Sequence, residues 1–238
     1  MVTRTRIALG PAFANLADDS AMSLLEWLFH RDALVDAYLG LAHYRQQRGM
    51  SWFIGKQAKL AIPREVGPSY LPAPDLSIHS TLGPCVLATV PIAHYGPPTL
   101  VIEVVSGTML MDNDLRFGIP GGKAVAYAAS GIAEYLVFDP CGDFIPEQIA
   151  AWRLGPTGDY VQWGPDATDR WVSSLGIAFA PQDTKLRVYD ETDELIPSYE
   201  ELADEREQPL RDAAREHAEQ QAQITELQDT LRRLRGEA

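Results

Sequence analysis

The stretch LVIEVVS, residues 100–106, predicts a buried β-strand that carries an acidic residue in its middle. Side chains alternate between the two faces of a strand, so Glu103 shares its face with Val101 and Val105. An ionised carboxylate left alone among valines would be strongly unfavourable. Glu103 must therefore be protonated, bound to a metal ion or paired with a cationic side chain. The simplest of these alternatives is a salt bridge to a lysine or arginine.

The segments around this strand predict the rest of the fold. Apolar residues recur at helical spacing over residues 32–48, and a short helix is predicted over 123–130 with Gly131 as its left-handed cap. Further strands are expected at residues 51–63, 74–80 and 133–140. This order predicts an α+β fold, a mixed β-sheet flanked by helices. Short segments at hairpin spacing between residues 148 and 190 predict an antiparallel extension.

The C-terminal segment has a different pattern from the rest of the chain. Two heptad positions, three residues apart, are mostly apolar: Leu210, His217, Ile224 and Leu231, and Ala213, Gln220, Leu227 and Leu234. His217 and Gln220 weaken the N-terminal half of this seam. This spacing is typical of a coiled coil and favours a homodimer, although a solvated helix that folds back on its own domain stays open. We therefore predict three parts: an irregular N-terminal segment 1–22, a globular domain 23–204 and a C-terminal coiled-coil helix 205–238.

Composition limits the partners of the protein. With 20 basic and 33 acidic residues the net charge is 20 − 33 = −13, so long-range attraction of nucleic acid is not expected, and no basic cluster stands out. No apolar run is long enough for a membrane span. The N-terminal apolar stretch is too short for a signal peptide. Cys85 and Cys141 are expected to be free buried thiols. Free thiols and the lack of a predicted signal peptide or membrane span together predict a cytoplasmic protein.

Three charged residues are the candidates for chemistry. Asp75 at the start of one strand and Glu103 within a neighbouring strand could converge on Mg²⁺ or Mn²⁺, although Asp75 after Pro74 also suits a turn. Lys123 stands in the first turn of the short helix, where a cation opposes the helix dipole, and Tyr127 lies four residues later on the same face. Lys123 could also be a solvated surface lysine.

These residues lie in an ordered set of motifs. APDLSIH (73–79), LVIEVVS (100–106) and KAVAYAASGIAEYLVFDP (123–140) together resemble the Uma-two-type putative restriction endonucleases, a bacterial branch of the PD-(D/E)XK nuclease superfamily. The resemblance extends from about residue 23 to residue 204. It implies a restriction-endonuclease-like sheet flanked by helices, and its C-terminal coiled coil is also similar to tails found in that family.

The resemblance implies a role for each candidate residue. Asp75 and Glu103 correspond to the metal ligands, and the backbone carbonyl of Val104 lies beside them. In the wider superfamily the basic residue comes two positions after the second acid, where this chain has Val105, so the resemblance implies that Lys123 takes the catalytic role. Tyr127, Arg116 and Asp114 are candidate supporting residues, with Arg116 a rival for the basic role.

The sequence thus predicts a Mg²⁺- or Mn²⁺-dependent endonuclease that hydrolyses phosphodiester bonds of DNA. Two other hypotheses stay open. One is a catalytically silent interaction module that keeps the fold and dimerises through its coiled coil. The other is a metal-dependent hydrolase of a smaller phosphate ester, which needs no extended basic surface.

Overall fold

The computed structural model describes residues 24–64, 69–105 and 122–236, and describes side chains of the first helix from Asp32 onward. The chain divides into two compact units, Met1–Ile196 and Pro197–Ala238. No helix in the described ranges combines the length and the apolar character that crossing a membrane requires.

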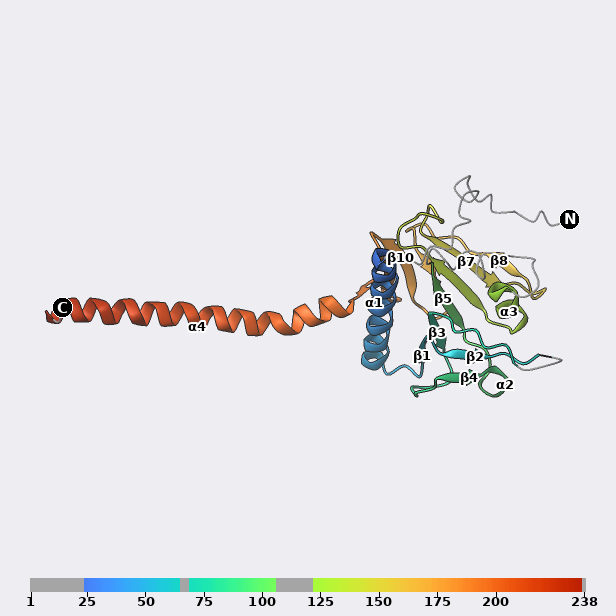
Figure 1. The fold of residues 1–238 in the computed structure, drawn as a ribbon, viewed down its shortest axis with the longest axis horizontal. Helices are drawn as coiled ribbons and strands as arrows, with labels where there is room; N and C mark the ends of the chain where they lie inside the picture. Colours follow the sequence, from blue (N-terminus) through green and yellow to red (C-terminus); the bar gives the residue numbers. More distant parts are fainter. Residues whose placement is uncertain (1–23, 65–68, 106–121, 237–238) are drawn as a thin grey trace. The chain divides into compact units, whose positions relative to one another are not determined.

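A six-stranded mixed sheet forms the centre of the N-terminal unit (Figure 1). Its order is β1-β3-β5-β6-β7-β8, with β1 (Phe53–Lys56), β3 (Leu76–His79), β5 (Leu100–Val104), β6 (Glu134–Phe138), β7 (Ile149–Leu154) and β8 (Tyr160–Gln162). β5 and β6 are parallel, and the other neighbours are antiparallel. Every residue of β5 and β6 is buried, because these two strands lie inside the sheet and are covered on both faces.

One face of this sheet packs against α1 (Leu24–Arg48) and a second, antiparallel sheet. The second sheet has the order β12-β11-β10-β9, with β9 (Trp171–Val172), β10 (Ala178–Gln182), β11 (Lys185–Tyr189) and β12 (Leu195–Ile196). Leu41, Ile78, Ile102, Phe138 and Phe179 belong to the core between these layers.

The opposite face of the central sheet carries smaller elements and the residues of interest. They are α3 (Lys123–Ala129), the parallel pair β2 (Lys59–Ala61) and β4 (Thr89–Pro91), and α2 (Ile92–Tyr95). Leu60, Val90, Val101, Tyr127 and Tyr135 belong to the core on this side. Figure 1 shows α1 and α3 on opposite sides of the central strands.

The C-terminal unit consists mainly of one helix, α4 (Tyr199–Arg235). It begins eleven residues before the first heptad residue, Leu210, because Ser198 and Glu201 form a capping box. The Ser198 side chain accepts from the Glu201 N–H, and the Glu201 side chain accepts from the Ser198 N–H. Pro209 lies inside the helix, and none of the helix residues is buried. Four of its leucines and its isoleucine are exposed: Leu210, Ile224, Leu227, Leu231 and Leu234.

The structure confirms the predicted α+β class, a mixed sheet with helices, an antiparallel second sheet and a long C-terminal helix. Gly131 follows α3 with φ of +80°, as predicted for a left-handed cap. The single strand expected at 51–63 is wrong: a turn at Gln57, with φ of +53°, divides it into β1 and β2. The cysteines form no disulfide, but the thiols expected to be buried are exposed, because Cys85 and Cys141 lie on loops.

Candidate active site

The sheet register brings Asp75 and Glu103 together. Leu76 of β3 is paired with Ile102 of β5, so the residues one step further along, Asp75 and Glu103, lie opposite each other on one face. Both lie at the end of the sheet where β5 ends. The face is the one that Val101 and Val105 occupy, as the alternation of LVIEVVS predicts.

The Glu103 carboxylate is completely buried, and three donors among the described residues contact it. Its Oε1 lies 3.1 Å from the Lys123 Nζ and accepts a 2.8 Å hydrogen bond from the Tyr127 hydroxyl. Its Oε2 accepts from the Asp75 N–H at 3.4 Å. The charge among the valines is therefore compensated by a buried ion pair and two hydrogen bonds, and the salt-bridge explanation of Glu103 is confirmed.

Asp75 is held between its two neighbouring strands. Its side chain is 4% exposed, and its Oδ2 accepts a 2.9 Å hydrogen bond from the Val104 N–H. Its backbone carbonyl accepts from the Gln57 N–H at 3.1 Å, where the chain leaves β1. These bonds link Asp75 to both strand ends, so the position of its carboxylate is fixed by the sheet and not only by a turn.

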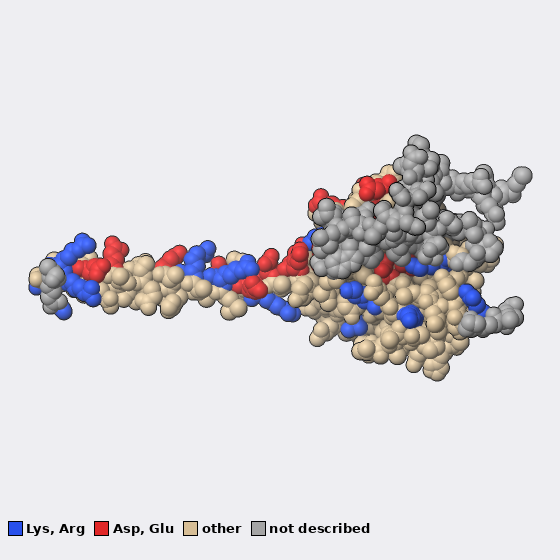
Figure 2. Space-filling model, in the orientation of Figure 1, with Lys and Arg blue, Asp and Glu red and all other residues tan. Residues whose placement is uncertain are grey.

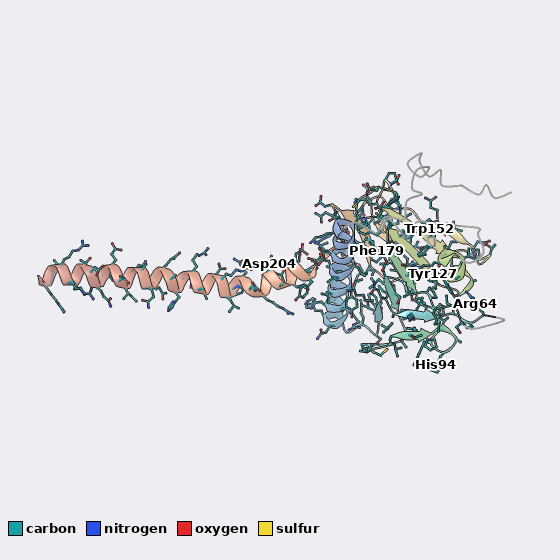
Figure 3. All side chains as sticks on the ribbon, viewed as in Figure 1. Arg64, His94, Tyr127, Trp152, Phe179 and Asp204 are labelled. Carbon is teal, nitrogen blue, oxygen red and sulfur yellow. The ribbon has the colours of Figure 1, made fainter. Side chains whose placement is uncertain are left out.

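Lys123 and Tyr127 both reach the same oxygen from α3. Lys123 is buried, although it opens a helix whose first turn has no acidic residue and no side-chain cap. The ion pair with Glu103 offsets the unfavourable position near the positive helix end. Tyr127, labelled in Figure 3, is fully buried and packs edge-on against Tyr135, with ring centroids 5.6 Å apart. The four-residue spacing therefore places both side chains on the face that contacts the sheet.

The structure thus brings Asp75, Glu103, Lys123, Tyr127 and the Val104 backbone into one cluster. Their catalytic and metal-binding roles stay predictions. Arg116 and Asp114 lie outside the described residues. Sequence reasoning missed that backbone N–H groups of Asp75 and Val104 link the two carboxylates, because that contact depends on strand register.

The donor chemistry of the cluster suits a hard divalent cation. Two carboxylates from adjacent strands offer the oxygen ligands that Mg²⁺ prefers, and Mg²⁺ keeps several waters and needs few protein ligands. In the described ranges no group of three or more His, Cys, Asp or Glu side chains could hold a metal ion. Asp75 and Glu103 are therefore compatible with an ion that is bound by two side chains and otherwise by water.

Glu134 and Asp139 are two further buried carboxylates, and their hydrogen bonds hold neighbouring segments together. Glu134 accepts from the Ser173 hydroxyl, from the Ser174 N–H at 2.8 Å and from the Arg153 Nε at 3.2 Å, which ties β6 to the segment after β9. Asp139 accepts from four N–H groups of the loop that follows β6. Neither contacts the Asp75–Glu103 cluster in the described contacts.

Comparisons with known proteins place this geometry in a family. The profile of the Uma2 family, described as "Putative restriction endonuclease", matches residues 21–189. No curated protein matches the chain. A crystal structure of a putative nuclease belonging to DUF820 from Anabaena variabilis ATCC 29413 is 14% identical, covers 58% of this chain and 69% of its own, and gives a TM-score of 0.38. Since the profile spans most of the chain, including Asp75, Glu103 and Lys123, this protein belongs to the Uma2 family of putative restriction endonucleases.

Proposed function

We propose that the protein is a metal-dependent endonuclease that hydrolyses phosphodiester bonds of DNA. The observation that carries the proposal is the buried cluster in which two carboxylates of neighbouring strands meet and one of them contacts the Lys123 ammonium. A buried ion pair alone is a poor source of stability, so its presence beside a second carboxylate favours a chemical role. Membership in the Uma2 family supports the same conclusion.

In this proposal Asp75 and Glu103 hold Mg²⁺ or Mn²⁺. The ion would supply a Lewis acid for the phosphate and lower the pKa of a bound water. The Val104 N–H donates to the Asp75 carboxylate. In a β-strand the N–H and the C=O of one residue point to the same side of the strand. This supports the Val104 carbonyl as a further ligand of the ion.

Lys123 is the basic residue of the proposed site. Its ammonium can donate to a phosphate oxygen as negative charge develops there, or orient the attacking water. The Tyr127 hydroxyl fixes the Glu103 oxygen that Lys123 contacts, so Tyr127 acts as a positioning residue. Arg116 and Asp114 stay candidate supporting residues.

Cleavage of plasmid and single-stranded DNA with Mg²⁺ or Mn²⁺ tests the proposal, with chelator as the blank. We expect Asp75→Ala and Lys123→Ala to lower the rate at least about 100-fold, the usual size of a lost acid–base or electrostatic contribution. Asp166→Ala is the matched control, because Asp166 is an exposed turn carboxylate. Equal rates for the wild type and Asp75→Ala would reject the site. Arg116→Ala measures the rival basic residue.

A second candidate function is a catalytically silent module that dimerises through α4. The observation in its favour is the seam of exposed apolar residues, Ile224, Leu227, Leu231 and Leu234, at heptad spacing. This alternative predicts that DNA is not cleaved and that calorimetry detects no Mn²⁺ binding. The endonuclease hypothesis predicts DNA cleavage and Mn²⁺ binding. The homodimer, the division at residues 204/205 and the cytoplasmic location stay predictions in either case.

A further inference from the structure

Strand β3 carries two buried polar atoms that form no hydrogen bond with any protein group in the described ranges. They are the Ser77 Oγ and the His79 Nε2. Ser77 is 0% exposed and His79 is 2% exposed, so bulk water does not reach them. The charged side chains coloured in Figure 2 lie at the surface instead, where solvent completes their hydrogen bonds. A buried polar atom without a partner is strongly unfavourable, so both atoms require one.

Ser77 and His79 point to the face of the sheet that carries the candidate site. Leu76 and Ile78 belong to the core on the α1 side. Because side chains alternate along a strand, Ser77 and His79 lie on the opposite face, together with Asp75, which comes two residues before Ser77. Three polar side chains in a row therefore occupy one face of a strand that is buried along its whole length.

The neighbouring strands surround these two side chains with apolar groups. Ser77 is paired with Gly55 of β1 and with Val101 of β5, and His79 is paired with Phe53 of β1. The Phe53 and His79 rings meet edge-on, with centroids 5.6 Å apart. A Cβ at Gly55 would lie 2.9 Å from the Ser77 Oγ, so only a glycine accommodates the hydroxyl there. None of these paired neighbours has a side-chain donor or acceptor to offer.

The spacing and the charge of the two groups suit one small neutral ligand. Residues two apart on a strand have Cα atoms about 6.6 Å apart. Two hydrogen bonds of about 2.8 Å that meet at one atom span at most about 5.6 Å, which brings both side chains within reach of it. Burial lowers the pKa of His79 from 6.5 to about 4, so its ring is neutral at pH 7 and one ring nitrogen can accept a hydrogen bond. Neither group is charged, which favours a neutral ligand over an ion.

We propose that one internal water molecule is bound between the Ser77 Oγ and the His79 Nε2, on the face of β3 that carries Asp75. The water donates one hydrogen to the His79 Nε2 and accepts the Ser77 hydroxyl hydrogen, so a single molecule gives both buried atoms a partner. The ring proton of His79 is then on Nδ1. This water site does not depend on the proposed endonuclease function, because neither residue has a role in that proposal.

Two measurements on the wild-type full chain test the water site directly. A high-resolution crystal structure should show an ordered water within about 2.7–3.2 Å of both atoms. Nitrogen-15 NMR of the His79 ring at pH 7 should show a neutral imidazole with its proton on Nδ1. A direct hydrogen bond between Ser77 and His79, a water that contacts only one of them, or a proton on Nε2 would each overturn the proposal.

Thermal unfolding of a pair of variants tests whether the two residues share one ligand. Ser77→Ala and His79→Phe should each lower the Tm, because either substitution leaves the water with one partner. The double variant should lose clearly less than the sum of the two single losses, since the second substitution removes a group that is already unpaired. Ser173→Ala with His79→Phe is the matched control. The Ser173 hydroxyl donates to Glu134 of β6, two strands away from β3, so these losses should add. Additive losses for Ser77 and His79 would overturn the shared water, and the wild-type NMR decides the matter if a variant fails to fold.

Discussion

The buried charge of Glu103 requires hydrogen-bond donors and a cation among its neighbours. Its Oε1 receives both the Lys123 ammonium and the Tyr127 hydroxyl, so each of these residues has a defined partner inside the core. Removing one member leaves the others buried and incompletely paired, which costs more than the lost contact itself. The individual contributions can therefore be separated by conservative substitutions.

Tyr127→Phe removes one hydroxyl and keeps the ring packing. We expect the free energy of unfolding to fall by about 1 kcal/mol, the usual net value of a hydrogen bond, and DNA cleavage to fall about tenfold because Glu103 loses a fixed contact. Tyr160→Phe is the control, since the Tyr160 hydroxyl donates to the Ile132 carbonyl at 3.1 Å. Urea unfolding and initial cleavage rates measure the two effects. If Tyr127→Phe loses no more activity than Tyr160→Phe, the Tyr127 hydroxyl has no positioning role.

His79 predicts a dependence of stability on pH. Burial lowers its pKa from 6.5 to about 4, and its Nε2 has no hydrogen-bond partner among the described residues. Between pH 6.5 and about 4 the unfolded chain takes up a proton here that the folded protein does not. The free energy of unfolding therefore falls as the pH is lowered, by at most roughly 3 kcal/mol.

Urea unfolding at pH 7 and pH 4.5 measures this contribution. The wild type should lose more stability over the interval than His79→Gln, in which the titrating group is absent. The same loss in both proteins would mean that His79 is protonated in the folded state.

At the scale of the element, the loop after β6 is organised by one carboxylate. Asp139 is 2% exposed, and four backbone N–H groups donate to it, from Cys141, Gly142, Phe144 and Ile145. Asp139→Ala should lower the free energy of unfolding by about 2–4 kcal/mol, because several buried donors lose a charged acceptor. Asp166→Ala removes a similar turn acceptor from an exposed loop and should cost less, since water replaces the carboxylate. Thermal unfolding of both variants compares them, and equal costs would contradict this account.

The elements differ in how well the sequence predicts them. β5, β6 and α3 were predictable because burial and helical spacing are local properties of LVIEVVS and KAVAYAAS. The division at Gln57 was not, since a positive φ at a glutamine has no sequence signal there. The start of α4 could have been found from Ser198 and Glu201, three residues apart as a capping box requires.

The site was predictable in part. The spacing of Lys123 and Tyr127 predicts one shared face, and both do contact Glu103. The approach of Asp75 to Glu103 depends on pairing between residues 28 positions apart, so their strand positions could suggest it but could not fix its contacts.

At the scale of the whole molecule, α4 carries the prediction of a homodimer. A helix of 37 residues is about 55 Å long and exposes Ile224, Leu227, Leu231 and Leu234 along one heptad seam. Sedimentation should give the mass of two copies for the full chain and of one copy for the chain that ends at residue 208. Leu227→Glu with Leu234→Glu should also give the smaller species, whereas Glu219→Gln, off the seam, should not. A full chain that sediments as a monomer would refute the dimer.

The short edges of the central sheet have a consequence for aggregation. Strands at a sheet edge expose backbone groups that can recruit a second chain, and long, flat, apolar edges are the most hazardous. Here the edges are β1, of four residues and ending at exposed Lys56, and β8, of three residues with Gln162 exposed. We therefore expect the concentrated protein to resist amyloid-like stacking, even though six strands form its centre.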